Sequence, residues 1–330
     1  STTVYAPQNR PDVRGQIGAV SAGHPLAAQA GLRVLQDGGN ATDAIIAMAG
    51  VLAVVRPHMN GIGGDAFGIF YDGETGEVTA LNASGRSGAL ATPEFFAAAN
   101  VERIPGIGPM SVSVPGAVAG WVDAHERYGS MDFASLLSTG IEYARNGFAV
   151  STRLAQDFEE QGGNLNEAGR DLYLPNAIAP PVGSLLRNPQ LANSLEIVAD
   201  EGKEGFYNGS IAQKLSAFIT EQGGYLRQDD FESHTSSWVT PLRGEYLNHV
   251  FVVMPPNTQG ITQLALFEMA KSHDLNLMEQ NSADYLHTLV ELKKLAFADR
   301  DRWVADPEHA NVPVEQLLDT NYLKQRAPLI

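Results

Sequence analysis

A glycine-rich turn at residues 61–66 is the first group in this chain whose residue types and spacing could serve chemistry. Gly61, Gly63 and Ala66 fit the pattern G-x-G-x-x-G/A, which cradles a pyrophosphate in dinucleotide-binding folds. In those folds the turn follows a strand and opens a helix, whereas here an apolar helical segment precedes it and a strand-like A-F-G-I-F-Y follows it. The order of elements therefore argues against a nucleotide site. We expect the glycines to allow close backbone approach and the turn to form a substrate-facing wall.

The side chains that usually carry catalysis form no recognisable motif in this chain. It has no cysteine, which excludes a thiol nucleophile, a thiolate metal site and disulfides. The eight histidines are scattered and none has H-E-x-x-H spacing; His287 and Glu291 fit a surface or core pair better than half of a metal site. His58 is a candidate base, but a capping or packing role fits it better. No G-x-S-x-G elbow occurs. The sequence therefore predicts no metal site.

Composition narrows the class of protein further. The chain has 330 residues, of which 44% are hydrophobic, so it can form a large core in one or two domains. Without repeats, low-complexity tracts or a linker-like shift, we expect a single domain over residues 1–330. The formal charge of -16 and the lack of a basic stripe argue against a nucleic-acid partner. The best apolar run, 44–55, is ended by Arg56 and Pro57, so no membrane span is predicted.

The N-terminal segment gives little information about compartment. Residues 1–14 are polar and carry Pro7 and Pro11, unlike a signal peptide, and we expect them to wrap the surface. The chain begins with serine, which is consistent with processing. The lack of cysteine suits both the cytoplasm and an exported compartment. The compartment therefore stays open, with the cytoplasm slightly favoured.

Helical periodicity dominates the sequence. Apolar spacing and cap residues predict helices at 24–36, 44–55, 115–129, 133–145, 189–200, 211–221, 258–271 and 284–303. Asn40 or Thr42 can cap the second helix. Strands are predicted at 66–71 and 77–82, forming a hairpin, and at 238–245 and 249–254. The pattern is α+β, with more helix than strand.

Seven short motifs follow one another along the chain. They are G-G-N-A-T-D-A (38–44), P-H-M-N-G-I-G-G (57–64), P-G-A-V-A-G (115–120), A-R-N-G-F (144–148), F-Y-N-G (206–209), M-P-P (254–256) and A-F-A-D-R (296–300). With these motifs in this order, the chain resembles the large subunit of the γ-glutamyltranspeptidase family, within the N-terminal-nucleophile hydrolases.

The resemblance implies an αββα sandwich to which this chain supplies the helix-rich large-subunit portion. In that family a precursor cuts itself and exposes a threonine at the start of a small subunit. The α-amine of that threonine takes the hydroxyl proton, and the oxygen attacks an amide carbonyl to form an acyl-enzyme. We therefore expect a small subunit with an N-terminal Thr from the same precursor, no catalytic residue in this chain, and no metal or organic cofactor. A dimer of such heterodimers is left open.

The resemblance also points to residues that would bind substrate. An ungapped match of A-L-N-A-S-G-R-S-G (80–88) puts Ser84 where the family has an arginine for the substrate carboxylate, and Arg86 lies two residues later. A guanidinium fork suits a carboxylate, so we expect Arg86, with Ser84, to contact substrate. The alternative is a structural ion pair of Arg86. A second departure is Asp65, which makes the turn more similar to the amidohydrolase members of the family, such as oxamate amidohydrolase and acylases.

These departures lead to one expected function and two alternatives. We expect a threonine amidohydrolase that cleaves, or transfers the acyl group of, a small carboxylate-bearing amide. The alternatives are a true γ-glutamyltransferase or glutathione hydrolase, and a noncatalytic relative that only binds small acidic ligands.

Overall fold

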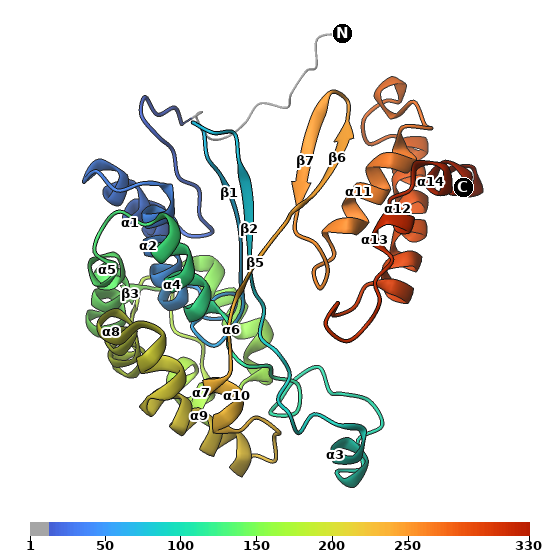
Figure 1. Ribbon diagram of the computed structural model, residues 1–330. Coiled ribbons are helices and arrows are strands. Elements are labelled where there is room, and N and C mark those ends of the chain that lie inside the picture. Colours follow the sequence, from blue (N-terminus) through green and yellow to red (C-terminus); the bar gives the residue numbers. More distant parts are fainter. Residues whose placement is uncertain (1–12) are drawn as a thin grey trace. The chain divides into compact units, whose positions relative to one another are not determined.

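The computed structural model describes residues 13–330, which divide into two compact units (Figure 1). Unit 1 holds the described residues up to Ala66 together with Ser84–Thr235. Unit 2 holds Phe67–Ala83 and Ser236–Ile330. The expectation that residues 1–14 wrap the surface falls almost entirely outside the described residues. The assignment of residues 1–330 to a single domain stays a prediction.

Unit 1 is built from helices around one hydrophobic core. Its longer helices are α1 (Pro25–Gln36), α2 (Ala41–Val55), α4 (Ala117–Tyr128), α5 (Phe133–Asn146), α6 (Thr152–Gln161), α8 (Pro189–Lys203) and α9 (Ser210–Glu221). Helix α2 is apolar on every side and packs between α1 and α5, as its sequence predicts. The shorter elements of this unit are α3 (Pro93–Ala98), β3 (Phe148–Ala149), α7 (Glu167–Tyr173), β4 (Leu185–Leu186) and α10 (Gln228–Glu232).

The start of α2 is fixed by a buried carboxylate. Asn40 caps the helix and Asp43, fully buried, accepts the Asn40 N–H in return at 2.9 Å. Asp43 also accepts the N–H groups of Ser130 and Met131 (3.0 and 3.3 Å) and the Ser130 hydroxyl. Burial acts to raise the pKa of Asp43, but these hydrogen bonds outweigh it and the net pKa lies below the usual value. The motif G-G-N-A-T-D-A therefore has a structural role, because it connects the start of α2 to the residues that follow α4.

Unit 2 combines two small sheets with a helical layer. Strands β1 (Ala66–Tyr71), β2 (Val78–Ala83) and β5 (Ser237–Val239) form a three-stranded sheet in the order β1-β2-β5. Strands β6 (Leu242–Tyr246) and β7 (His249–Val253) form an antiparallel pair. The helices are α11 (Gly260–Ala270), α12 (Ala283–Trp303), α13 (Val314–Leu317) and α14 (Thr320–Arg326). Met269, Leu292 and Leu323 lie at the centre of their shared core.

The predicted strand at 238–245 is wrong as a single element. The structure divides it into β5, which pairs with β2 through Ala80 and Val239, and β6, which pairs with β7. The break falls at Thr240 and Pro241. Proline has no N–H group for a strand ladder, so the chain leaves one sheet there and enters the other.

The remaining predicted elements are present with small shifts at their ends. The helix expected from Pro115 begins at Ala117, and the one expected from residue 44 begins at Ala41. Helix α6 was not predicted, although Ser151 caps it by accepting the Leu154 N–H. The α+β class, with more helix than strand, is confirmed. Among the described helices, none has both the length and the apolar character that a bilayer crossing requires.

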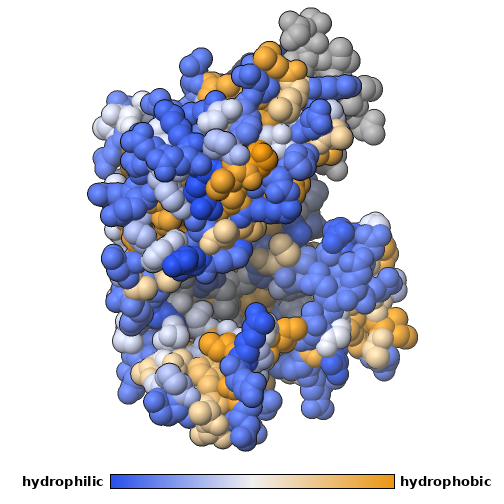
Figure 2. All heavy atoms as spheres, turned by 90° about the vertical axis from the view of Figure 1, so that its right-hand side faces the viewer, coloured by the Kyte–Doolittle hydropathy of each residue, from blue (hydrophilic) through white to orange (hydrophobic). Residues whose placement is uncertain are grey.

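One face of β1 is apolar and exposed. Phe67, Ile69 and Tyr71 keep 47%, 44% and 71% of their surface open. Alternate residues of a strand lie on the same side of the sheet, and β1 is an edge strand of its sheet. On the face of the molecule drawn in Figure 2, hydrophobic residues are likewise exposed among predominantly hydrophilic ones. The exposed side of β1 offers surface that a further chain could cover.

Candidate active-site segment

The two residues predicted to bind substrate flank Gly85, directly after β2. Ser84 and Arg86 are both half-buried. The Gly85 N–H donates to Asp65 Oδ1 at 2.8 Å, and the Val114 N–H donates to the Arg86 carbonyl at 2.9 Å. A Cβ atom on residue 85 would lie 1.7 Å from the Val114 carbonyl oxygen. Only glycine therefore fits at this position without movement of the main chain.

The Arg86 side chain is anchored at one of its nitrogens. Nη1 donates to the Thr235 carbonyl at 2.9 Å. A guanidinium carries five N–H donors, so the group has the capacity to bridge a main-chain carbonyl and an anion. The structure thus brings Ser84 and Arg86 into one segment with a fixed main chain. Their role in substrate binding stays a prediction.

The glycine turn is held by the start of α4. The Gly64 carbonyl accepts the N–H groups of Gly116 and Ala117 at 2.9 and 2.8 Å. The Tyr207 hydroxyl donates to the Pro115 carbonyl at 2.7 Å and accepts the Ala119 N–H at 3.1 Å. Three N–H groups at the start of α4, where an anion could bind, are therefore already used: two by the turn and one by Tyr207. This arrangement agrees with the rejection of a nucleotide site and links three of the sequence motifs.

A neutral imidazole lies beside this segment. His234 is 9% exposed, and its ring packs against Tyr207 with centroids 5.2 Å apart. Neither ring nitrogen has a hydrogen-bond partner among the described residues. Burial lowers the pKa of His234 to about 4, and the positive charge of Arg86 acts in the same direction against an opposing effect of Asp123. At neutral pH this histidine therefore adds no positive charge to the site.

We expect His234 to make folding stability fall on acidification. Its pKa is 6.5 in the unfolded chain and about 4 in the folded one, so between these values the unfolded chain binds more protons. Near pH 5 the difference is about 0.9 proton, which corresponds to a slope of about 1 kcal/mol per pH unit. His234→Phe keeps an aromatic ring against Tyr207 and should remove this part of the slope. Denaturant unfolding from pH 4.5 to 7.5 measures it.

The matched control for that measurement is His249→Gln, because His249 lies exposed on β7. The unfolding free energy of His249→Gln should change with pH as steeply as that of the unchanged protein. An identical slope for His234→Phe and the unchanged protein would rule out the proposed titration of His234.

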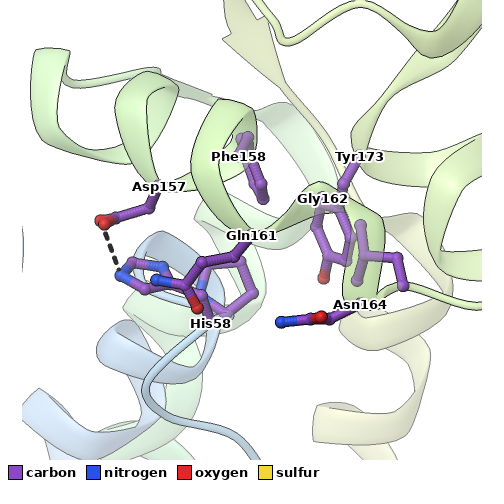
Figure 3. Close-up of a pocket in the computed structure, with 9 residues that line it drawn as sticks. His58, Asp157, Phe158, Gln161, Gly162, Asn164 and Tyr173 are labelled. Carbon is purple, nitrogen blue, oxygen red and sulfur yellow. Dashed lines mark ion pairs between the residues drawn. The ribbon is translucent and has the colours of Figure 1, made fainter.

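His58 takes a structural role in the turn. Its Nε2 lies 2.9 Å from Oδ2 of Asp157, which is buried on α6 and also pairs with Arg153 (Figure 3). Burial lowers the pKa of His58, while the charge of Asp157 opposes the change. The pair borders a cavity of about 190 Å³ that is also lined by Phe158, Gln161, Asn164 and Tyr173. The ion pair with Asp157 thus connects the segment before the glycine turn to α6.

The other histidines give no catalytic grouping among residues 13–330. His125 Nε2 lies 2.7 Å from the Met131 carbonyl oxygen. On α12, Glu291 pairs with Lys294, which agrees with a surface role. Asp306, Glu308 and His309 approach one another but are all exposed, as acidic groups commonly are without an ion.

Sequence reasoning missed several contributors to the segment. Tyr207 lies in the motif F-Y-N-G, so the sequence marked this residue. The motif did not predict its hydrogen bonds to Pro115 and Ala119. Thr235 and His234 belong to no motif. Their place beside Arg86 depends on main-chain folding over more than a hundred residues, which no local pattern reveals.

The chain is similar to known proteins along nearly all of its length. The family model for γ-glutamyltranspeptidase matches residues 27–330. The glutathione hydrolase-like YwrD proenzyme of Bacillus subtilis is 37% identical over 306 residues, which cover 92% of this chain and 58% of the relative. The oxamate amidohydrolase proenzyme of Klebsiella pneumoniae is 35% identical over 321 residues, which cover 95% of this chain and 60% of the relative.

Solved structures agree with these matches. The γ-glutamyltranspeptidase of Helicobacter pylori superposes with a TM-score of 0.91 at 28% identity. That match covers 97% of this chain and 93% of the other chain. The present chain therefore has nearly the whole fold of the H. pylori chain, but it spans less than two thirds of the two curated relatives.

Proposed function

Because the chain belongs to the γ-glutamyltranspeptidase family, we propose that it is the large subunit of a threonine amidohydrolase of the N-terminal-nucleophile type. The enzyme would cleave, or transfer the acyl group of, a small carboxylate-bearing amide. The position of Arg86 supports this substrate class. Its side chain donates to the Thr235 carbonyl, and the main chain is held by hydrogen bonds on both sides.

Family membership confirms the fold expected from the resemblance. The chain is an α+β, helix-rich part of the N-terminal-nucleophile hydrolase architecture, as the close superposition on the H. pylori chain shows. Both curated relatives are proenzymes by name, which agrees with a precursor that is cut.

A second chain completes the proposed enzyme. We infer a small subunit from the same precursor that begins with the nucleophilic Thr. The shares of 58% and 60% that this chain covers in the two proenzymes support it, as does the exposed apolar face of β1 formed by Phe67, Ile69 and Tyr71. A dimer of these heterodimers and a location in the cytoplasm stay predictions.

The proposed reaction divides its work between the two chains. The α-amine of the Thr takes the hydroxyl proton, the oxygen bonds to the amide carbonyl carbon, and the C–N bond breaks as the nitrogen leaves with a proton. Water or an amine then takes the acyl group from the ester. In this chain the Arg86 guanidinium would hold the substrate carboxylate, and the Ser84 hydroxyl would hydrogen-bond the same group. None of these steps calls for a metal or an organic cofactor.

The departures at Ser84 and Asp65 favour an amidohydrolase over a γ-glutamyltransferase. In the ungapped match to the family, Ser84 takes the position of the carboxylate-binding arginine, and Asp65 adds a carboxyl group to the turn G-I-G-G-D. The name of the B. subtilis relative favours the second candidate, a glutathione hydrolase. A noncatalytic ligand-binding relative is the third, and it would release no ammonia from any amide.

We expect the mature protein to release ammonia or amine from oxamate or glutaryl amides more efficiently than from glutathione. Arg86→Ala should lower kcat/KM about 30-fold, mainly through KM, because a charge-assisted hydrogen bond to the carboxylate is lost. Arg86→Lys should retain part of the binding, since it keeps the charge but not the fork. Ammonia release under steady-state conditions measures these values.

Two controls separate binding from folding. Arg33→Ala removes an exposed arginine of α1 and should leave KM unchanged. An amide without a carboxylate should be cleaved equally by the unchanged protein and by Arg86→Ala. Preferred turnover of glutathione would contradict the substrate class, and an unchanged KM in Arg86→Ala would contradict the role of Arg86.

A further inference from the structure

We propose that Asp65 is a positioning residue that fixes the substrate-binding segment Ser84–Arg86 through the main-chain N–H of Gly85. The inference rests on the proposed function, because it gives Asp65 its effect through Arg86 and the substrate carboxylate. Asp65 itself is not a catalytic residue in this proposal.

Two main-chain hydrogen bonds hold the segment Ser84–Arg86. Between Ser84 and Arg86, the N–H of Gly85 points to Asp65 Oδ1 at 2.8 Å, and the carbonyl of Arg86 accepts the Val114 N–H at 2.9 Å. The first bond holds the Ser84–Gly85 peptide unit and the second holds the Arg86–Ser87 peptide unit, so the main chain is restrained on both sides of the Gly85–Arg86 pair. The bonds to Asp65 and Val114 therefore restrain the main chain from which the Arg86 side chain projects.

Gly85 has no side chain that could restrain its own main chain. Its Cα lies so close to Val114 that an added Cβ would meet the Val114 carbonyl oxygen. Glycine also has the greatest freedom of all residues when it is not restrained. A hydrogen-bond acceptor for the Gly85 N–H is therefore needed to restrain the main chain at this residue. Asp65 provides that acceptor.

The main chain next to Asp65 is itself held by hydrogen bonds. Its neighbour Gly64 accepts two N–H groups at the start of α4, those of Gly116 and Ala117. Asp65 therefore belongs to a turn that is hydrogen-bonded to the start of α4. Through this turn, α4 limits the movement of Asp65, and Asp65 in turn limits the movement of Gly85. Partial burial of the Asp65 carboxyl raises its pKa above the usual value, and the hydrogen bond from the Gly85 N–H opposes this change only in part.

This arrangement predicts a particular kinetic signature. Arg86 would bind a carboxylate that is present in both the ground state and the transition state, so loosening Arg86 should raise KM and leave kcat nearly unchanged. A carboxylate that only stabilised the fold would change the unfolding free energy without changing KM.

The test uses the mature two-chain enzyme and three variants. In Asp65→Ala, we expect exchange of the Gly85 amide hydrogen to rise at least about tenfold and KM to rise about tenfold, with kcat within about twofold. Asp65→Asn keeps a carbonyl oxygen as acceptor and should restore both values. Asp72→Ala is the matched control, because Asp72 is an exposed carboxylate that accepts the Glu74 and Thr75 N–H groups at another turn.

Several results would overturn the proposal. One is unchanged exchange at Gly85 in Asp65→Ala; another is faster exchange with an unchanged KM; a third is failure of Asp65→Asn to restore KM. If the unchanged enzyme cleaves none of the amides, the proposed function fails. The positioning role of Asp65 is then tested by exchange of the Gly85 amide hydrogen and by calorimetric measurement of glutarate binding. The affinity for glutarate should fall about tenfold in Asp65→Ala, and it should stay unchanged if Asp65 has no such role.

Discussion

Asp43→Ala is expected to destabilise the protein by about 4 kcal/mol, the largest stability effect that we predict. The change removes a buried carboxylate and leaves the N–H groups of Asn40, Ser130 and Met131 without their charged acceptor. A hydrogen bond to a charged group contributes about 1.5–3 kcal/mol, and three main-chain N–H groups lose one here. Asp43→Asn keeps one acceptor oxygen and should show about half the effect. Equilibrium unfolding in denaturant measures both.

Asp132→Ala is the matched control for Asp43→Ala. Asp132 is also a helix-capping aspartate, but it is exposed and accepts one N–H, from Ser135. Its loss should cost about 1 kcal/mol. A loss below about 1 kcal/mol for Asp43→Ala would contradict the structural role of the motif G-G-N-A-T-D-A.

The pH dependence of the Asp43 contribution has a defined sign. The folded pKa lies below the usual value of 3.8, so the unfolded chain binds the proton more readily. The stabilisation is therefore complete well above pH 3.8 and is lost as pH falls through the folded pKa. The difference between the unchanged protein and Asp43→Asn should stay constant from pH 7 to about 5 and shrink below about pH 4.

Asp43 also illustrates which contacts a sequence can reveal. Local spacing was sufficient to predict a cap at Asn40 or Thr42, because a cap and its helix are adjacent in the chain. The partners Ser130 and Met131 lie 87 and 88 residues away, and no periodicity connects them to Asp43. The sequence therefore predicts the helix and its start, but not the reason for a buried aspartate there.

Gly85→Ala is expected to lower kcat/KM more than about 100-fold and to destabilise unit 1 by about 3 kcal/mol. The new Cβ atom would lie 1.7 Å from the Val114 carbonyl oxygen, which is main chain and cannot rotate away. The segment must shift, and both its bond to Asp65 and the direction of the Arg86 side chain change with it. Unfolding in denaturant and the ammonia assay measure the two effects.

The control for Gly85→Ala is Gly106→Ala, where an added Cβ meets nothing within 4 Å. This variant should match the unchanged protein in both assays. Normal stability and activity in Gly85→Ala would show that the close approach to Val114 is not present in the protein.

The candidate site was predictable only in part, and for a physical reason. Ser84 and Arg86 were identified through the resemblance, and the structure places them on one half-buried segment. The anchor of Arg86 is the carbonyl of Thr235, 149 residues later, and a main-chain carbonyl carries no residue type that a sequence pattern could detect. The same limit explains why the single strand expected at 238–245 was wrong. Pro241 marks a break, but only the two separate partner strands, β2 and β7, show that the chain enters a second sheet there.

We propose above all that this chain belongs to a self-cleaving threonine amidohydrolase. Intact mass and N-terminal sequencing of the purified product of the complete gene test it most directly. We expect two chains, the second beginning with Thr, and a single uncut precursor without amidase activity when that Thr is replaced by Ala. A product that stays one chain while it hydrolyses amides, or a second chain that begins with another residue, would contradict the claim.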